Sequence, residues 1–161
     1  IICDNIRSLE NIGSIFRTSD ALGVAKIYLC GVSAVAPVGE SQEHFLKRKI
    51  AKTAIGAENT VPFEFYKSTS KLIDKLKSGK IKVVALEQDP PARQAGKKAI
   101  LYTKFTPKFP MALIVGNEVD GVSKKILQKC DKIIYLPMFG QKESLNVAVS
   151  FGIAGYYIKN F

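Results

Sequence analysis

The chain has 161 residues, which suits one domain with a substantial buried core that needs no disulfide or metal to hold it together. Apolar residues make up 47% of the chain and charged residues 24%, which excludes a disordered or fibrous protein. The formal net charge of +10 favours a polyanionic partner, nucleic acid before an anionic membrane surface, although a generic lysine-rich surface would carry the same charge.

The cysteines and the hydropathy pattern say more about compartment than about activity. Cys3, Cys30 and Cys130 are far apart and match no metal-ligand spacing, so we expect neither a disulfide framework nor a zinc site. No apolar run is long enough to span a bilayer, and no secretory leader is present. We expect a cytoplasmic protein that has no membrane contact. The chain begins at Ile1 in a strand-like run, so a fragment that lacks upstream residues, such as an RNA-binding extension, stays open.

Strand-like and helix-like segments alternate along the chain. Apolar runs of strand length occupy residues 1–3, 25–30, 61–66, 81–86, 111–115 and 132–136. They do not alternate apolar with polar residues, which is typical of strands buried on both faces in a parallel sheet. Helical patterns occupy residues 12–19, 43–56, 72–76, 123–130 and 145–159. The order predicts a single α/β domain over residues 1–161, with a mostly parallel sheet covered by helices. Residues 87–99, with two prolines and a glycine, predict a loop rather than a domain linker.

Three polar loops follow predicted strands, where ligands bind in parallel α/β sheets. They read DNIRSLENIGSIFR, GNEVDGVS and PMFGQKESLNVAVS. Neither a GxGxxG turn nor a GxxxxGK loop is present, which argues against a dehydrogenase, a P-loop enzyme and a flavodoxin-like nucleotide-binding domain. Each loop alone also has a purely structural interpretation. The second could be a glycine turn with solvated acids, Ser144 could only cap a helix, and Arg17 could form a surface ion pair with Asp20.

Taken together, the three loops resemble the SpoU branch of the SPOUT RNA methyltransferases, knotted enzymes that methylate ribose 2′-oxygens. The family's Asn, Gly and Arg motif matches ENIGSIFRTSDALG, and its Gly-x-Glu-x-x-Gly turn matches GNEVDG. Its Pro-Met loop before Ser-Leu-Asn-Val matches LPMFGQKESLNVAVS. The resemblance covers nearly the whole chain in the family's order and spacing. Its one departure is Leu136, where the family usually has Ile, and this exchanges one branched aliphatic side chain for another.

The resemblance implies a deep C-terminal trefoil knot, in which residues of about 112–159 pass through a loop. Without the resemblance, a knot would not be expected, because chains that thread through loops are nearly absent from proteins. The family's cofactor is S-adenosyl-L-methionine, bound in the knot mostly by backbone groups. Its contacts fall on the following residues: Leu86, Gly116, Leu136, Met138 and Leu145. Family enzymes are homodimers packed through the last helix, and Ala148, Gly152 and Gly155 would offer a face of small residues for that contact.

Methyl transfer from a sulfonium to a hydroxyl needs alignment and a proton acceptor, and no metal. The resemblance implies these catalytic residues: Asn11, Arg17, Glu118, Ser144 and Asn146. The matching arginine is proposed in the family as the general base. Because a guanidinium is not normally deprotonated, we expect Arg17 to orient the phosphate beside the target ribose instead. Asn11 would orient Arg17 or the ribose. Glu118 would hold the second loop and its partner arginine, and Ser144 with Asn146 would line the acceptor side.

Two further features lie outside these motifs. The single histidine, His44, is expected to be a solvated surface residue. The run KRKIAK contains Lys47, Arg48, Lys49 and Lys52, which could follow an RNA backbone or form a solvated helix face.

The motifs and the resemblance together predict an S-adenosylmethionine-dependent RNA 2′-O-ribose methyltransferase that acts on tRNA or rRNA. The alternative is a relative that binds RNA without turnover. Neither the target RNA nor the nucleotide can be read from the residues.

Overall fold

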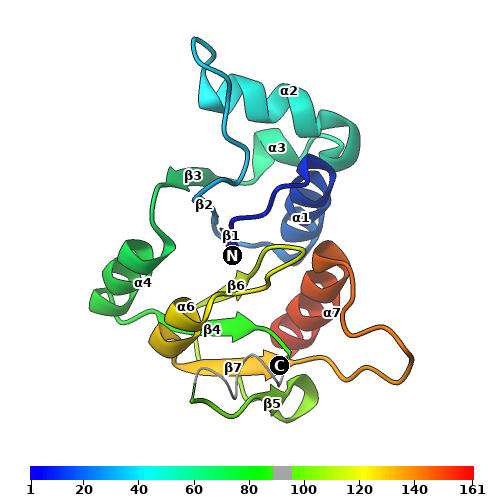
Figure 1. Cartoon of the computed structure of the whole chain (residues 1–161). Coiled ribbons are helices and arrows are strands. Elements are labelled where there is room, and N and C mark those ends of the chain that lie inside the picture. The colour runs from blue at the N-terminus through cyan, green and yellow to red at the C-terminus, as the bar shows by residue number, and fades with distance from the viewer. Residues whose placement is uncertain (89–95) are drawn as a thin grey trace.

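The computed structural model describes residues 1–88 and 96–161. Its strands form one sheet in the order β3-β2-β1-β6-β4-β7-β5, and every neighbouring pair is parallel (Figure 1). The strands are β1 Ile2–Asp4, β2 Ile27–Cys30, β3 Phe63–Tyr66, β4 Lys82–Leu86, β5 Ile100–Leu101, β6 Met111–Val115 and β7 Lys132–Tyr135. The helices are α1 Leu9–Leu22, α2 Gln42–Ala54, α3 Ala57–Thr60, α4 Thr69–Ser78, α6 Lys124–Lys129 and α7 Val147–Lys159, with a 3₁₀ turn at Tyr102–Lys104.

Helices cover both faces of the sheet. This was predicted from the strands, in which apolar and polar residues do not alternate. In Figure 1, α1 and α7 lie on one side of the sheet, and α4 and α6 lie on the other. Each face has its own hydrophobic cluster, and successive strand residues enter them in turn: Leu113 and Val115 of β6 enter one, Ala112 and Ile114 the other. The α/β fold class and the parallel sheet are confirmed.

The six predicted strands are all present, and the remaining differences are local. The sequence missed β5, which has two residues at the sheet edge, and the four-residue helix α3. The predicted helix 43–56 ends early because Ile55 and Gly56 adopt left-handed backbone conformations, with φ of 51° and 92°. Of the predicted loop 87–99, residues 89–95 lie outside the described residues, and the others form neither helix nor strand.

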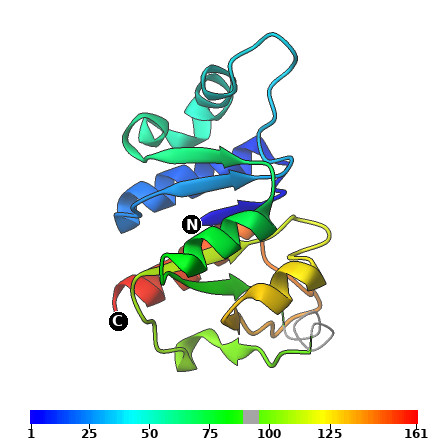
Figure 2. The same ribbon diagram turned by 90° about the vertical axis from the view of Figure 1, so that its left-hand side faces the viewer.

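Parallel strands bring their carboxyl ends to one edge of the sheet, as the arrowheads in Figure 2 show. β1 pairs with β6, and β4 lies between β6 and β7. The loops that follow these four strands are therefore neighbours at the centre of that edge, although they are far apart in the sequence. The three loops that the sequence singled out follow β1, β6 and β7.

The small residues of α7 pack inside the chain. Ala148 and Gly155 are buried, and a Cβ at Gly155 would stand 2.6 Å from Leu22 Cδ1 of α1. Ala148 and Gly155 therefore pack within the chain rather than in the expected intermolecular face, and Gly155 lets α1 approach α7 closely. Gly152 is half-buried, and a Cβ there would have only Thr18 Cγ2 near it, at 3.9 Å. None of the helices in the described part of the chain is both long enough and apolar enough to span a membrane.

Candidate functional site

A cavity of about 930 Å³ lies beyond the carboxyl ends of β4, β6 and β7. Its walls include all five residues predicted for the cofactor, namely Leu86, Gly116, Leu136, Met138 and Leu145. They also include three of the predicted catalytic residues, Glu118, Ser144 and Asn146. The remaining two, Asn11 and Arg17, belong to α1 and do not line it. The structure thus brings together residues that are up to 60 positions apart, from Leu86 to Asn146.

The turn after β6 is shaped by two glycines and an asparagine. Gly121 has φ of +63° and donates its N–H to Asn117 O at 3.0 Å. A Cβ at Gly116 would overlap the backbone of Gly121, and a Cβ at Gly121 would overlap the carboxylate of Glu87. Asn117 Oδ1 accepts the N–H of Val119 at 2.8 Å, while its Nδ2 donates to Asn5 O at 2.8 Å. The turn is therefore fixed both within itself and to the loop after β1.

Glu118 uses both carboxylate oxygens to hold the loop after β1. Oε1 accepts hydrogen bonds from Ser8 N at 3.1 Å and Asn11 Nδ2 at 3.0 Å, and Oε2 accepts one from Arg7 N at 3.3 Å. Partial burial raises the pKa of the Glu118 carboxyl, but these hydrogen bonds outweigh it, so that the pKa lies below its ordinary value of 4.5. An anionic group whose oxygens are already engaged is suited to positioning rather than to accepting a proton.

A hydrogen bond between two asparagines joins the first motif to the third. Asn146 Nδ2 donates to Asn11 Oδ1 at 2.9 Å, and Asn11 in turn donates to Glu118. Asn146 Oδ1 also accepts the N–H groups of Ala148 and Val149, so Asn146 is the N-cap of α7. The interpretation of Ser144 as that cap is wrong. Ser144 is exposed beside the cavity.

Arg17 lies apart from this line of hydrogen bonds. It is exposed, and six residues along a helix turn its side chain about 120° away from Asn11. The ion pair considered for it is not formed; Asp20 Oδ1 instead accepts a hydrogen bond from Thr60 Oγ1 at 2.7 Å. Among the described residues no salt bridge contains Arg17. No hydrogen bond among the described residues joins Arg17 to Asn11 or Glu118.

The basic run lies on α2, away from the cavity. Lys47 pairs with Glu43 at 2.8 Å and Arg48 with Glu40 at 2.9 Å, whereas Lys49 and Lys52 are exposed. His44 has an exposed side chain, as the sequence predicted, with Nδ1 3.6 Å from Glu40 Oε1.

Sequence reasoning missed Glu87 and Asn5, which also shape this edge of the sheet. Glu87 follows β4 and lines the cavity. Asn5 follows β1 with φ of +57°, and its Oδ1 accepts Val32 N at 3.2 Å. Their positions directly after buried strands were the available signal. The partners of both side chains are set by strand register, which the sequence does not show.

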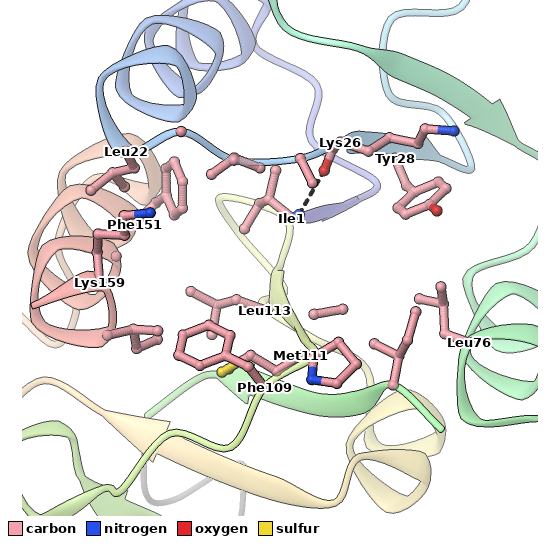
Figure 3. A pocket seen from close by; sticks show the side chains of 18 residues that line it. Ile1, Leu22, Lys26, Tyr28, Leu76, Phe109, Met111, Leu113, Phe151 and Lys159 are labelled. Atoms are coloured by element: carbon pink, nitrogen blue, oxygen red, sulfur yellow. Dashed lines mark hydrogen bonds between the residues drawn. The ribbon is translucent and has the colours of Figure 1, made fainter. Parts of the chain in front are cut away.

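A second hollow of about 450 Å³ opens at the opposite edge of the sheet (Figure 3). Its walls are largely apolar, with Leu22, Met111, Leu113 and Phe151 among them. The described residues that line it include no carboxylate, serine or asparagine. It contains none of the predicted site residues, so the polar cavity at the carboxyl edge is the candidate site.

The fold is shared with solved enzymes that are named as SpoU proteins. The TrmH/SpoU tRNA modifying enzyme of A. aeolicus superposes with a TM-score of 0.79 at 26% identity, over 99% of this chain and 72% of that one. The SpoU methyltransferase AviRb of Streptomyces viridochromogenes, solved with AdoMet, gives 0.78 at 24% identity, over 99% and 58% of the two chains.

The chain belongs to the SpoU rRNA Methylase family, whose model matches residues 1–156. It is 30% identical to the 23S rRNA (guanosine(2553)-2′-O)-methyltransferase RlmP of Bacillus subtilis, over 99% of this chain and 57% of that protein. It is 29% identical to the 23S rRNA (guanosine-2′-O-)-methyltransferase RlmB of Neisseria meningitidis, over 95% and 54% of the two chains. This chain thus spans little more than half the length of these relatives.

Proposed function

We propose that this chain is an S-adenosylmethionine-dependent methyltransferase domain, comprising residues 1–161, that transfers a methyl group to a ribose 2′-hydroxyl of tRNA or rRNA. The observation that carries the proposal is the line of hydrogen bonds from Glu118 through Asn11 to Asn146. It joins the three family motifs beside one cavity. Membership of the SpoU rRNA Methylase family and the names of the relatives give further support.

The cavity fits the proposed cofactor in size and in chemistry. Its volume of about 930 Å³ lies within the range of small-molecule sites, roughly 300–1,000 Å³. Leu86, Leu136 and Leu145 supply apolar surface suited to a flat heterocycle, and the backbone around Gly116 supplies donors and acceptors suited to polar groups. When bound, S-adenosylmethionine supplies an electrophilic methyl group on a sulfonium.

The side chains then have positioning roles. Glu118 holds the loop after β1 against the turn after β6, and Asn146 holds Asn11 and the start of α7. Arg17, exposed on α1, orients the phosphate next to the target ribose through its planar fork. The hydroxyl proton leaves to that phosphate or to water. Alignment of this kind can contribute up to about 7–11 kcal/mol to the lowering of a barrier.

Calorimetry tests the cofactor, and RNA chemistry tests the reaction. S-adenosylmethionine and its demethylated product should each release heat on binding and raise the unfolding temperature. Absence of both effects for both compounds would remove the methyltransferase proposal. Transfer of labelled methyl to total RNA separates an enzyme from a relative that only binds RNA. Mapping 2′-O-methyl sites in RNA from cells with and without the protein would identify the target.

We also infer a homodimer through the exposed side of α7. Val149, Ile153 and Tyr156 recur there at helical spacing with exposed fractions of 51%, 40% and 50%. Ile153→Glu should convert a dimer to a monomer in sedimentation at micromolar concentration. Val38→Glu, in an exposed loop, is the matched control and should stay dimeric. A monomeric wild-type protein would contradict the inference.

We also propose a C-terminal knot and a cytoplasmic location. Residues 112–159 supply most of the cavity wall around the end of β4, which is the arrangement that a threaded C-terminal segment would have. A crystal structure would trace the crossing.

Three free, buried cysteines support a reducing compartment, and burial raises the pKa of Cys3 to about 12, which keeps its thiol protonated. Fractionation of cells would report the location.

A further inference from the structure

Glu87 connects two strands and a turn at the mouth of the cavity. Its backbone N–H donates to Ile134 O of β7 at 3.0 Å. Its carboxylate reaches across to the turn after β6, where Oε2 accepts Val122 N at 2.6 Å, while Oε1 accepts Gln88 N at 2.8 Å. Both oxygens thus accept backbone N–H groups, and no salt bridge of the described residues includes Glu87.

The turn after β6 has room for the Glu87 carboxylate because Gly121 has no side chain. A Cβ at Gly121 would overlap Glu87 Oε2, so a larger residue there would push the carboxylate away from Val122 N. Gly121 itself contacts Gly116, where a Cβ would overlap the Gly121 backbone. The two glycines and the carboxylate therefore pack directly against one another. Glu87, Gly116 and Gly121 all line the cavity.

We propose that Glu87 is a positioning residue for the cofactor cavity: it clamps the turn of residues 116–122 to the end of β4, and so keeps the Gly116 backbone in a binding arrangement. The identity of the bound molecule rests on the proposed function, whereas the clamp can be tested without any ligand. Glu87 acts through the turn and does not itself contact a reacting atom.

A carboxylate suits this position better than an amide. Two backbone donors need two acceptors, and glutamine offers one acceptor oxygen and one NH₂ group. Whichever way the amide of Glu87→Gln turns, one N–H then faces another donor. Hydrogen bonds to an ionised acceptor are also stronger than neutral ones, so the remaining bond is weakened as well.

The first experiment compares Glu87→Gln with the wild-type protein, using S-adenosylmethionine and its demethylated product as probes in calorimetry. We expect the dissociation constant for each to rise about tenfold or more, the loss typical of a hydrogen bond to a charged group. In the protein without cofactor, the Val122 amide should exchange with deuterium faster than in wild type. Glu64→Gln makes the same change of charge at a half-exposed ion pair with Lys26, 3.4 Å long, and both readouts should stay as in wild type.

The second experiment is a double-mutant cycle on stability. Gly121→Ala introduces backbone strain at φ of +63° in any background, and it also displaces the carboxylate when Glu87 is present. In Glu87→Ala only the strain remains, so the destabilisation by Gly121→Ala should be smaller there than in wild type. Equal destabilisation in both backgrounds contradicts the clamp.

The outcomes separate the clamp from the proposed function. If Glu87→Gln binds both compounds as wild type does and its Val122 amide is equally protected, the clamp is refuted while the methyltransferase proposal stands. If the wild-type protein binds neither compound, the proposed function fails. Amide exchange and the double-mutant cycle then still decide for or against the clamp.

Discussion

At the scale of single residues, Arg17 gives the sharpest test of the proposed chemistry. Its side chain neither lines the cavity nor joins the hydrogen bonds of Asn11 and Glu118. Arg17→Ala should therefore leave the dissociation constant for S-adenosylmethionine within about twofold of wild type. Methyl transfer should fall by about 100-fold or more, the usual effect of losing a group that orients a reacting partner. Calorimetry and single-turnover methyl transfer are the two measurements.

The companion substitution is Arg17→Lys, which keeps the charge and loses the planar fork. Because bidentate pairing to phosphate needs that fork, lysine should restore little of the lost rate. A fully active Arg17→Lys would show that charge alone matters. Near wild-type transfer by Arg17→Ala would exclude Arg17 from the reaction altogether.

The lowered pKa of Glu118 leads to a prediction about how the stability of the fold depends on pH. Its pKa is lowered in the folded chain from an ordinary value of 4.5, so its hydrogen bonds add stability above that value and lose it as pH falls through the lowered pKa. Glu118→Gln should be less stable than wild type at neutral pH. The difference should be constant down to the ordinary value of 4.5 and shrink below it. Urea unfolding at a series of pH values measures this, and a difference that grows on acidification would contradict the assignment.

Individual residues of the candidate site could be singled out from the sequence where residue type and position agreed. Glu118 and Asn146 lie in loops after strands, Asn11 lies in the first turn of the helix after β1, and the resemblance connected the three residues. Their hydrogen bonds to one another were not visible, because the partners are 107 and 135 positions apart. Ser144 was mistaken for the cap of α7 because serine and asparagine cap equally well, and Asn146 stands two positions later.

At the scale of elements, strand and helix positions followed from apolar runs and helical periodicity. The predictions missed two short elements, β5 and α3, and placed the end of α2 too late, because the left-handed backbone at Ile55 is not visible in the sequence. Small residues on α7 were correctly seen as a place of close approach. Their partner could not be inferred, because nothing in the spacing tells an intramolecular helix from a second chain.

The glycines of α1 and α7 predict a graded series of stabilities. A Cβ at Gly152 has Thr18 Cγ2 as its nearest neighbour at 3.9 Å, so Gly152→Ala should stabilise the chain by up to about 1 kcal/mol through helix propensity. Gly155→Ala meets Leu22 Cδ1 at 2.6 Å and should be less stable than Gly152→Ala. Gly13→Ala overlaps Thr53 of α2 and stands 3.0 Å from Ile50 O, and should cost about 1–3 kcal/mol.

Urea unfolding of the three variants provides its own control, since each replaces a helical glycine by alanine. Propensity alone would stabilise all three by similar amounts. That outcome would contradict the close packing of α1 against α2 and α7.

At the scale of the whole molecule, the sequence predicted a parallel sheet but not its strand order. β1 lies between β2 and β6, and β4 between β6 and β7, so strands distant in the sequence pair at the centre. Alternation of strands and helices does not encode such pairing. This order brings the loops after β4, β6 and β7 to one cavity and places the loop after β1 beside the turn after β6. Glu87 could not be singled out from the sequence, because its role depends on the pairing of β4 between β6 and β7.

The charge of the whole molecule leads to the last prediction, on RNA affinity. With a net charge of +10, binding should weaken steeply as salt rises, and each lost phosphate contact should lower the slope by about 0.7 for single-stranded RNA. Lys49 is exposed and has no carboxylate partner among the salt bridges of the described residues, whereas Lys47 pairs with Glu43 at 2.8 Å. Lys49→Ala should therefore reduce the slope more than Lys47→Ala, because Lys47 must first leave Glu43. Fluorescence anisotropy with one RNA at several salt concentrations measures both slopes. If neither variant changes the slope, α2 is a solvated helix face, and the RNA lies elsewhere on the molecule.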